Sequence, residues 1–252
     1  MNIKMMVTDL DGTLLREDET VSSRTVSVLQ RCRDKGIKIV YATGRGSSAD
    51  DVVKPIVFDG RIRVNGATAF AGDVPIYRKW IHTNEIRDML LAADAAGIKI
   101  VAEYMDHHYS NFDFREIWPW LEGYVEADFK ELDTDIEKIY SHTEIQANAL
   151  PFFEKHLPKG TYLSVTRDGT IMMLREGAAK SQATAALAKH WNIKPEEIVA
   201  FGDDLNDLDL LKYAGTAVVM KDGLDQAKAI ADEICGSNEN DGLAKWMEER
   251  VL

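Results

Sequence analysis

The sequence has 252 residues, and its 42 acidic and 30 basic side chains give a formal net charge of −12. This negative charge disfavours nucleic acid and anionic membrane surfaces as partners. Hydrophobic residues make up 45% of the chain, as in a folded globular protein, and no apolar stretch approaches the roughly 18 residues that cross a membrane.

The first third of the chain alternates apolar, strand-like runs with a helical pattern. Three apolar runs predict strands over 3–7, 37–42 and 62–64. The spacing of Val26, Leu29 and Cys32 predicts a helix over 21–35, which Gly36 is placed to end. Strands that alternate with helices in this way indicate a parallel sheet.

The middle of the chain, over 82–174, differs in composition. Five of the six histidines fall there, at positions 82, 107, 108, 142 and 156. A helical stripe runs from Ile86 to Ala93, and Arg167-Asp168-Gly169 is typical of a hairpin turn. Strands are predicted over 98–104, 144–149, 162–166 and 170–174. We therefore predict a separate α/β domain inserted at 82–174.

The last third returns to the pattern of the first. Helices are predicted over 181–191, 207–213 and 226–231, and strands over 198–201 and 217–220. The predicted fold class is α/β, with a doubly wound, Rossmann-like parallel-sheet core formed by 1–81 and 175–252. Cys32 and Cys235 lie far apart in helix-like contexts, which predicts buried thiols in a cytoplasmic protein.

The segment Asp9-Leu10-Asp11-Gly12-Thr13 follows the first predicted strand, at the end where ligands bind in open parallel sheets. A carboxylate such as that of Asp9 can attack phosphorus and form an aspartyl-phosphate. A second carboxylate two residues later, Asp11, can protonate the leaving oxygen and then accept a proton from water. The alternative is an ordinary turn, which explains one Asp and Gly12 but not the whole segment.

Two further segments are weak signals on their own. Thr43-Gly44-Arg45 ends the second predicted strand, and a hydroxyl beside a glycine suits phosphate, although such residues more often form a plain turn. Lys180 stands at the predicted start of a helix, where the helix dipole mildly disfavours a cation. This mismatch suggests a functional lysine, and the alternative is a lysine that faces solvent.

The segment Gly202-Asp203-Asp204-Leu205-Asn206-Asp207 contains three carboxylates within five residues, directly after a predicted strand. Two unit charges about 4 Å apart interact by about 4 kcal/mol at an effective dielectric constant near 20. Mg²⁺ relieves such repulsion, and it typically binds one or two carboxylates together with substrate phosphate. The alternative is that Asp203 or Asp204 caps the following helix, and one acid can cap while another binds the metal.

These four segments, in this order, resemble the haloacid dehalogenase (HAD) superfamily of phosphohydrolases. The large insertion between the second and third segments resembles the Cof-type subfamily, which carries an α/β cap domain at that position. The resemblance covers essentially the whole chain, including Asn65-Gly66-Ala67 and the tail segment 237–242. It implies that the domain at 82–174 is a cap that selects the substrate.

The resemblance also implies a role for each site residue. Asp9 would be the nucleophile and Asp11 the general acid and base. The side chains of Asp9 and Asp203 and the backbone carbonyl of Asp11 would hold Mg²⁺, and Asp207 would support Lys180 and the metal. The groups that would grip the phosphate are the Leu10 backbone N–H, Thr43, Gly44, Lys180 and Asn206.

The implied function is that of a magnesium-dependent phosphatase acting on a small phosphorylated metabolite, such as a sugar phosphate or a phosphorylated cofactor. The alternative enzyme is a phosphomannomutase-like phosphomutase, and a non-catalytic sensor is a third interpretation. Asp11 favours hydrolysis, because an alkoxide leaving group needs a proton. The sequence leaves open which metabolite is the substrate and whether the protein is a monomer or a homodimer.

Two regions add no site residues. Lys221-Asp222-Gly223 departs from the small Gly-Asn-Ala-like turn of the subfamily, and Lys221 is expected to face solvent rather than to reach the substrate. In the predicted cap, both tryptophans are expected to pack within the domain, and none of the candidates for substrate contact is assigned to the site. These candidates are His107, His108, Tyr109, Trp118 and Trp120.

Overall fold

The structure is a computed structural model that describes residues 2–105, 107–116, 119, 123–143, 146–166 and 169–252. The chain divides into two compact units. The first, called the core unit here, consists of Met1–Arg78 and Ala179–Leu252, and the second, the inserted unit, is Lys79–Ala178. Each unit is built around hydrophobic clusters of its own.

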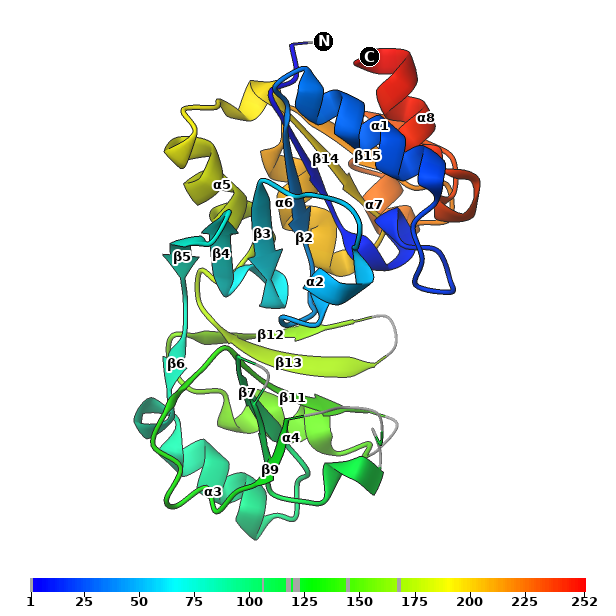
Figure 1. The fold of residues 1–252 in the computed structure, drawn as a ribbon. Coiled ribbons are helices and arrows are strands. Elements are labelled where there is room, and N and C mark those ends of the chain that lie inside the picture. Colours follow the sequence, from blue (N-terminus) through cyan, green and yellow to red (C-terminus); the bar gives the residue numbers. More distant parts are fainter. Residues whose placement is uncertain (1, 106, 117–118, 120–122, 144–145, 167–168) are drawn as a thin grey trace. The chain divides into compact units, whose positions relative to one another are not determined.

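The core unit contains an eight-stranded sheet in the order β16-β15-β14-β1-β2-β3-β4-β5 (Figure 1). Neighbouring strands from β16 to β3 are parallel, whereas β4 and β5 pair antiparallel at one edge. The bounds are β1 (Met5–Thr8), β2 (Lys38–Ala42), β3 (Gly60–Arg63), β4 (Thr68–Ala71), β5 (Val74–Arg78), β14 (Ile198–Gly202), β15 (Thr216–Val219) and β16 (Glu233–Ile234). The predicted α/β class is confirmed, and the antiparallel edge was not foreseen.

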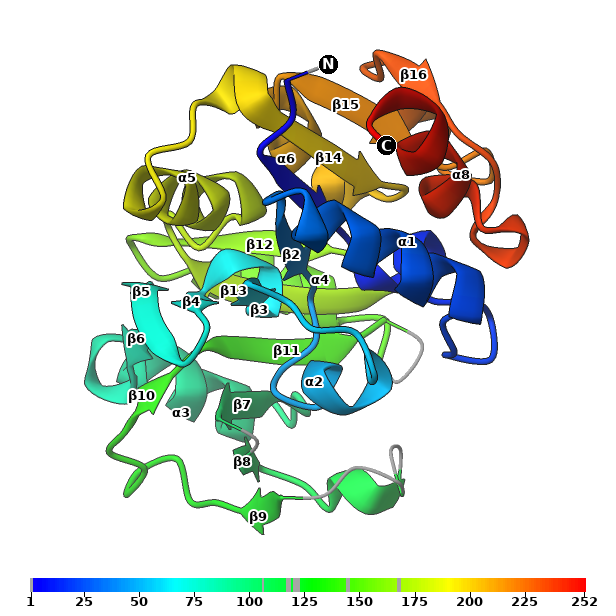
Figure 2. The same ribbon diagram turned by 45° about the horizontal axis from the view of Figure 1, so that its top comes forward.

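Helices cover both faces of this sheet. Successive side chains of a strand point to opposite faces, so Met6 packs in one hydrophobic cluster while Met5 and Val7 pack in the other. The first cluster includes residues of α1 (Ser23–Asp34), α2 (Ala49–Val52) and α8 (Gly242–Arg250). The second includes residues of α5 (Lys180–His190), α6 (Leu208–Tyr213) and α7 (Asp225–Lys228). Figure 2 shows α1 beside α8, a packing that the contacts between these helices confirm.

The central strands of the core unit bring distant segments together. Strand β1 lies between β2 and β14, with Met5 opposite both Lys38 and Ile198. All three strands are parallel, so their carboxyl ends meet at one edge of the sheet. Asp9 directly follows β1, Thr43 follows β2 and Asp203 follows β14. The fold therefore gathers three of the predicted functional segments at this edge.

The inserted unit contains a six-stranded sheet in the order β12-β13-β11-β7-β8-β9 and a two-stranded sheet of β10 and β6. Helices α3 (Arg87–Ala95) and α4 (Ala149–His156) contribute Leu90 and Phe153 to a hydrophobic cluster with side chains of the larger sheet. The strands are β6 (Ile81–His82), β7 (Val101–Tyr104), β8 (His107–Ser110), β9 (Tyr124–Glu126), β10 (Asp135–Ile136), β11 (Lys138–His142), β12 (Thr161–Val165) and β13 (Thr170–Arg175).

The predicted strand over 144–149 is wrong in its described part, because no strand is assigned over 146–148 and α4 begins at Ala149. The Gln146 side chain accepts a hydrogen bond from the backbone N–H of Lys99 and donates one to its carbonyl. The strand that pairs with β7 and β13 is instead β11. The hydrophobic pattern does not indicate β11, because its first residue, Lys138, is charged and nevertheless buried. Lys138 forms an ion pair with Glu103 at 3.1 Å.

Besides positions 144 and 145 of the predicted strand over 144–149, parts of three other predictions fall outside the described residues. Trp118 and Trp120 lie there, as do Arg167 and Asp168 of the predicted hairpin turn. The two strands on either side of that turn, β12 and β13, do pair antiparallel.

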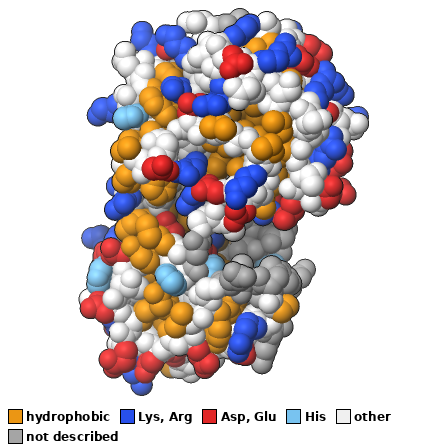
Figure 3. Space-filling model, in the orientation of Figure 1, with side chains coloured by type: hydrophobic (Ala, Val, Ile, Leu, Met, Phe, Trp, Pro, Cys, Tyr) orange, Lys and Arg blue, Asp and Glu red, His pale blue; other side chains and the backbone are white. Residues whose placement is uncertain are grey.

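The surface carries both signs of charge. On the face drawn in Figure 3, acidic and basic side chains are interspersed. Within the described residues, no helix has both the length and the apolar character needed to cross a membrane.

Candidate active site

A buried lysine connects two carboxylates at the edge where β1 and β14 end. The Nζ atom of Lys180 donates hydrogen bonds to Oδ1 of Asp9 and to Oδ1 of Asp207, each at 2.6 Å. The side chains of Lys180 and Asp207 are fully buried and that of Asp9 is nearly so. A buried ammonium is tolerated only when charges and hydrogen bonds compensate it, and these two carboxylates do so.

Local structure sets each of these positions. Asp9 directly follows β1, and its backbone N–H donates to the carbonyl of Phe201 at 3.0 Å. Lys180 is the first residue of α5. Asp207 ends the short helical turn Leu205–Asp207, and its Oδ2 accepts hydrogen bonds from the backbone N–H groups of Asp203 and Asp204, at 3.0 and 3.1 Å. The Asp207 carboxylate therefore joins the loop after β14 to Lys180.

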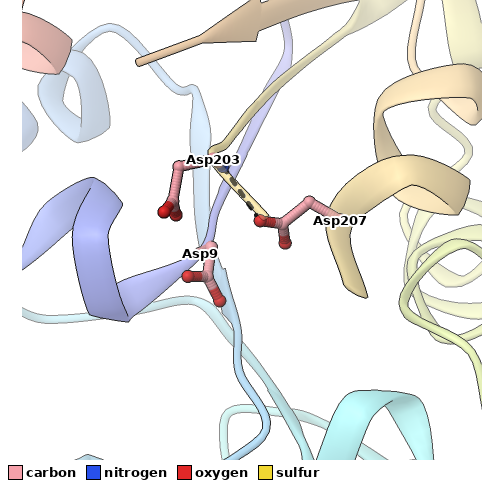
Figure 4. Close-up of side chains that lie close together, drawn as sticks. All are labelled: Asp9, Asp203 and Asp207. Carbon is pink, nitrogen blue, oxygen red and sulfur yellow. Dashed lines mark hydrogen bonds between the residues drawn. The ribbon is translucent and has the colours of Figure 1, made fainter. Parts of the chain in front are cut away.

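Asp203 completes an acidic cluster with Asp9 and Asp207. One carboxylate oxygen from each of the three lies within 4.8 Å of the others. Figure 4 shows the three side chains close together, with the backbone of Asp203 hydrogen-bonded to Asp207. The Thr13 hydroxyl donates to Oδ1 of Asp203 at 2.7 Å and fixes the orientation of this carboxylate.

This cluster holds three carboxylates and one ammonium group, and its environment shifts the pKa values of Asp203, Asp9 and Lys180. Burial, followed by the nearby Asp207 carboxylate, raises the pKa of Asp203 to about 7. Burial also raises the pKa of Asp9 well above its usual range. Burial alone would lower the pKa of Lys180, but the Asp207 and Asp9 carboxylates outweigh it and hold that pKa above its ordinary value.

The donor set fits a hard divalent cation. Three ionised carboxylates and one ammonium leave two negative charges, which a dication would neutralise. Oxygen ligands from one or two carboxylates are what Mg²⁺ typically takes from a protein. Asp207 already uses both oxygens in hydrogen bonds, so Asp9 and Asp203 are better placed to supply ligands.

Asp11 lies apart from the buried cluster. Its side chain is 53% exposed, and Arg45 binds both of its oxygens, with Nε donating to Oδ2 at 2.9 Å and Nη2 to Oδ1. Arg45 also pairs with Glu19 at 2.6 Å. The backbone N–H of Arg45 donates to the Thr43 hydroxyl at 3.1 Å. Arg45, in the segment after β2, therefore binds Asp11, the second acid of the segment after β1.

The remaining predicted site residues lie on loops of the core unit. Thr43 is fully buried directly after β2, and Gly44 follows it. Asn206 is half-buried, and its Nδ2 donates to Oδ1 of Asn65 at 3.1 Å. Leu10 packs its side chain in the hydrophobic core.

Sequence reasoning gave no role to three residues that contact predicted site residues. Thr13 and Arg45 lie inside segments that were singled out, and Asn65 lies in a segment noted only for its resemblance. Lys180, by contrast, was predicted either to be functional or to face solvent, and it is buried in an ion-pair network rather than exposed. Lys221 is exposed, as expected.

Comparison with known proteins finds one matching family model and several similar phosphatases. A family model described as haloacid dehalogenase-like hydrolase matches residues 6–247. The chain is 25% identical to 5-amino-6-(5-phospho-D-ribitylamino)uracil phosphatase YitU of Bacillus subtilis, over 97% of this chain and 96% of the relative. It is 23% identical to pyridoxal phosphate phosphatase YbhA of Escherichia coli, over 100% of each chain. The solved structure of BT1666 from Bacteroides thetaiotaomicron, a phosphatase, matches with a TM-score of 0.83 at 25% identity, covering 98% of this chain and 94% of that chain.

Proposed function

Since this chain belongs to the haloacid dehalogenase-like hydrolase family, we propose that it is a Mg²⁺-dependent phosphatase that forms an aspartyl-phosphate on Asp9. The predicted family, of Cof type, and the predicted class of phosphoric monoester hydrolase are confirmed by the family match and by the named phosphatases among its relatives. The observation that supports the proposed mechanism is the buried Lys180, which holds Asp9 beside Asp203 and Asp207.

In the proposed first step, a carboxylate oxygen of Asp9 bonds to phosphorus while the bond from phosphorus to the leaving oxygen breaks. Asp11 gives a proton to that oxygen, and the alcohol departs. In the second step, water attacks the phosphorus of the aspartyl-phosphate and gives a proton to Asp11. Inorganic phosphate leaves, and the Asp9 carboxylate is restored. Asp11 suits this role because it is the more exposed of the two acids, although Arg45 holds it.

The side chains of Asp9 and Asp203 and the backbone carbonyl of Asp11 would hold Mg²⁺, with Asp207 in support. When bound, the ion supplies positive charge that stabilises the oxygens of the transferring phosphoryl group. The carboxylates of Asp9, Asp203 and Asp207 lie close together, and the pKa values of Asp9 and Asp203 are raised. Both observations support this assignment, because a dication favours the ionised form of a carboxylate.

The phosphate would be bound by groups from four segments of the core unit. Lys180 offers a cation, and Asn206 and Thr43 offer polar side chains. The backbone N–H groups of Leu10 and Gly44 complete the set, because backbone donors approach phosphate closely where side chains are small or turned away. These groups lie on loops that follow β1, β2 and β14 or at the start of α5.

The proposed substrate is a small phosphorylated metabolite, such as a sugar phosphate or a phosphorylated cofactor. Two relatives named for different phosphorylated compounds support a substrate of this size without choosing among such compounds. We propose that the inserted domain, predicted at 82–174, is the cap that selects the substrate, and that 1–81 and 175–252 form the catalytic domain. A cytoplasmic monomer or homodimer is proposed, and the buried free thiols of Cys32 and Cys235 support a reducing compartment.

Phosphate release from p-nitrophenyl phosphate with MgCl₂ tests the proposal, using Asp9→Asn as the variant. We expect Asp9→Asn to lose at least about a thousandfold in rate, because the amide is a poor nucleophile. Asp73→Asn is the matched control, since the side chain of Asp73 is fully exposed, and it should keep the wild-type rate. Mg²⁺-dependent release by Asp9→Asn at the wild-type rate would refute the assignment. Little net release, with dependence on a sugar bisphosphate, would point to the phosphomutase instead.

A further inference from the structure

Three successive residues after β3 adopt left-handed backbone conformations. The φ angles are 51° at Val64, 51° at Asn65 and 94° at Gly66. Glycine adopts such angles freely and asparagine tolerates them, but a β-branched valine rarely does. Val64 and Asn65 are 0% and 4% exposed, so this conformation is held by the surrounding structure rather than by solvent. Backbone strain that is maintained in this way is often found at functional sites.

The strained turn Val64–Gly66, called the clasp below, is bound first to the segment after β2. The backbone N–H of Asn65 donates to the carbonyl of Thr43 at 2.8 Å. The backbone N–H of Val64 donates to the carbonyl of Arg45 at 3.0 Å. These two bonds lie on either side of Gly44, so the clasp fixes the backbone of the second functional segment.

The side chain of Asn65 connects this segment to the one after β14. Its Oδ1 accepts a hydrogen bond from Nδ2 of Asn206 at 3.1 Å. The same oxygen would lie 3.3 Å from a Cβ atom added to Gly44, which is closer than most real Cβ contacts. Asn65 therefore lies against Gly44 and binds Asn206 at the same time.

The last residue of the clasp contacts the segment that leads into α5. A Cβ atom on Gly66 would lie 2.2 Å from the carbonyl oxygen of Ala179, the residue before Lys180. Only glycine permits so close an approach of the two backbones. The clasp thus contacts three of the four segments that carry the predicted phosphate-binding residues.

We propose that Asn65 is a positioning residue that fixes the amide of Asn206 through its Oδ1, so that the clasp sets the geometry of the phosphate site. An amide has two N–H donors, and donation of one to Asn65 fixes the direction of the other, which is then available to a phosphate oxygen. Asn65 acts through Asn206 and does not itself touch the substrate. This inference rests on the proposed phosphatase function.

A double-mutant cycle tests the inference. Asn65→Gly removes Oδ1 but keeps a residue that adopts the left-handed conformation without strain. We expect it to lower kcat/KM for p-nitrophenyl phosphate about tenfold, and to weaken the binding of inorganic phosphate by a similar factor in calorimetric titration with MgCl₂. In an Asn206→Ala background, Asn65→Gly should change either quantity less than about twofold, because the partner is already absent.

Two controls separate positioning from a purely structural role. Asn192→Gly replaces another left-handed asparagine of the core unit, at φ 54°, and should leave both quantities unchanged. Melting temperatures followed by circular dichroism identify the folded variants. If Asn65→Gly does not fold, Asn65→Ser, whose side chain is shorter, closes the same cycle.

Equal losses in the wild-type and Asn206→Ala backgrounds would overturn the inference, as would a wild-type-like Asn65→Gly. If the wild-type protein binds inorganic phosphate but releases none from the substrate, only the proposed function is refuted. The double-mutant cycle can then still be measured by phosphate binding. A wild-type protein that binds no inorganic phosphate would overturn both.

Discussion

Arg45 holds Asp11 by both carboxylate oxygens and shares its guanidinium with Glu19. A planar guanidinium that binds a carboxylate in this bidentate way fixes its orientation as well as its charge. Asp11 is the proposed acid and base, and it is more than half exposed, so few other contacts hold it in place. Arg45 therefore fixes the position of the Asp11 carboxylate, the proposed proton donor.

Substitution of Arg45 by alanine should lower kcat more than it raises KM. We expect kcat to fall about tenfold, since misplacement of a general acid has effects of this size or larger. Steady-state kinetics with p-nitrophenyl phosphate measure the change. Glu19→Gln serves as the control, because it removes the other partner of Arg45 and should stay within about twofold of wild type. An unchanged kcat in Arg45→Ala would show that Asp11 needs no such partner.

At the residue scale, the sequence predicted the acids better than their partners. Asp9, Asp203, Asp207 and Lys180 do come together, because each lies where a strand ends or a helix begins. Their roles stay predictions. The contact of Asn65 with Asn206 joins residues 141 positions apart, so neither spacing nor residue type indicates it.

At the scale of single elements, the turn after β1 depends on one glycine. Gly12 has a φ of 76°, and a Cβ atom there would lie 2.4 Å from Oδ2 and 2.9 Å from Cγ of Asp203. The segment after β1 can therefore lie against the segment after β14 only if residue 12 has no side chain. The same approach lets Thr13 donate to Asp203.

Gly12→Ala should therefore impair metal binding as well as stability. We expect a loss of about 1–3 kcal/mol in the free energy of unfolding and a marked rise in the MgCl₂ concentration needed for half-maximal activity. Gly72→Ala is a matched control, because Gly72 also has a positive φ, 54°, but has open space around it. It should lose stability through backbone strain alone and keep its Mg²⁺ dependence. Equal Mg²⁺ dependence in the two variants would contradict the predicted contact.

Helices and strands were predicted well where their buried residues are also hydrophobic. Strand β14 and helix α1 lie within two residues of their predicted bounds, because their buried positions are mostly apolar. Strand β11 was missed, because Lys138 and Ser141 are polar and nevertheless buried, and their partners come from distant parts of the chain. The β4–β5 pair was also missed, since β5 contains Pro75 and is exposed or half-buried throughout, although its sequence is largely apolar.

For the molecule as a whole, the acidic cluster predicts an unusual dependence of stability on pH. The pKa of Asp203 is about 7 in the folded chain, against 3.8 for an ordinary aspartate. Between these values the folded state binds a proton that the unfolded state releases, so stability falls as pH rises through this window. The loss is on the order of a few kcal/mol and is complete above the folded-state pKa.

Thermal unfolding of metal-free protein in EDTA, from about pH 5 to about pH 8, measures this loss. We expect the melting temperature of wild type to fall relative to that of Asp203→Asn, which has no carboxyl group to titrate there. Mg²⁺ bound as proposed would compete with the proton, so MgCl₂ should raise the melting temperature more at the upper end of this range than at the lower. A parallel pH dependence of the two proteins would contradict the assigned pKa shift.

The division of the core unit into two stretches of chain also affects how the protein is made. Strand β1 pairs with β14, so the ribosome must add the whole of Lys79–Ala178 before this partner exists. At about 5–20 residues per second, the delay is on the order of ten seconds. When Ala178 has been added, the inserted unit has all of its residues, whereas β1 still has a free edge open to other chains until β14 follows. Nascent chains stalled before β14 are therefore expected to be the form most dependent on chaperones.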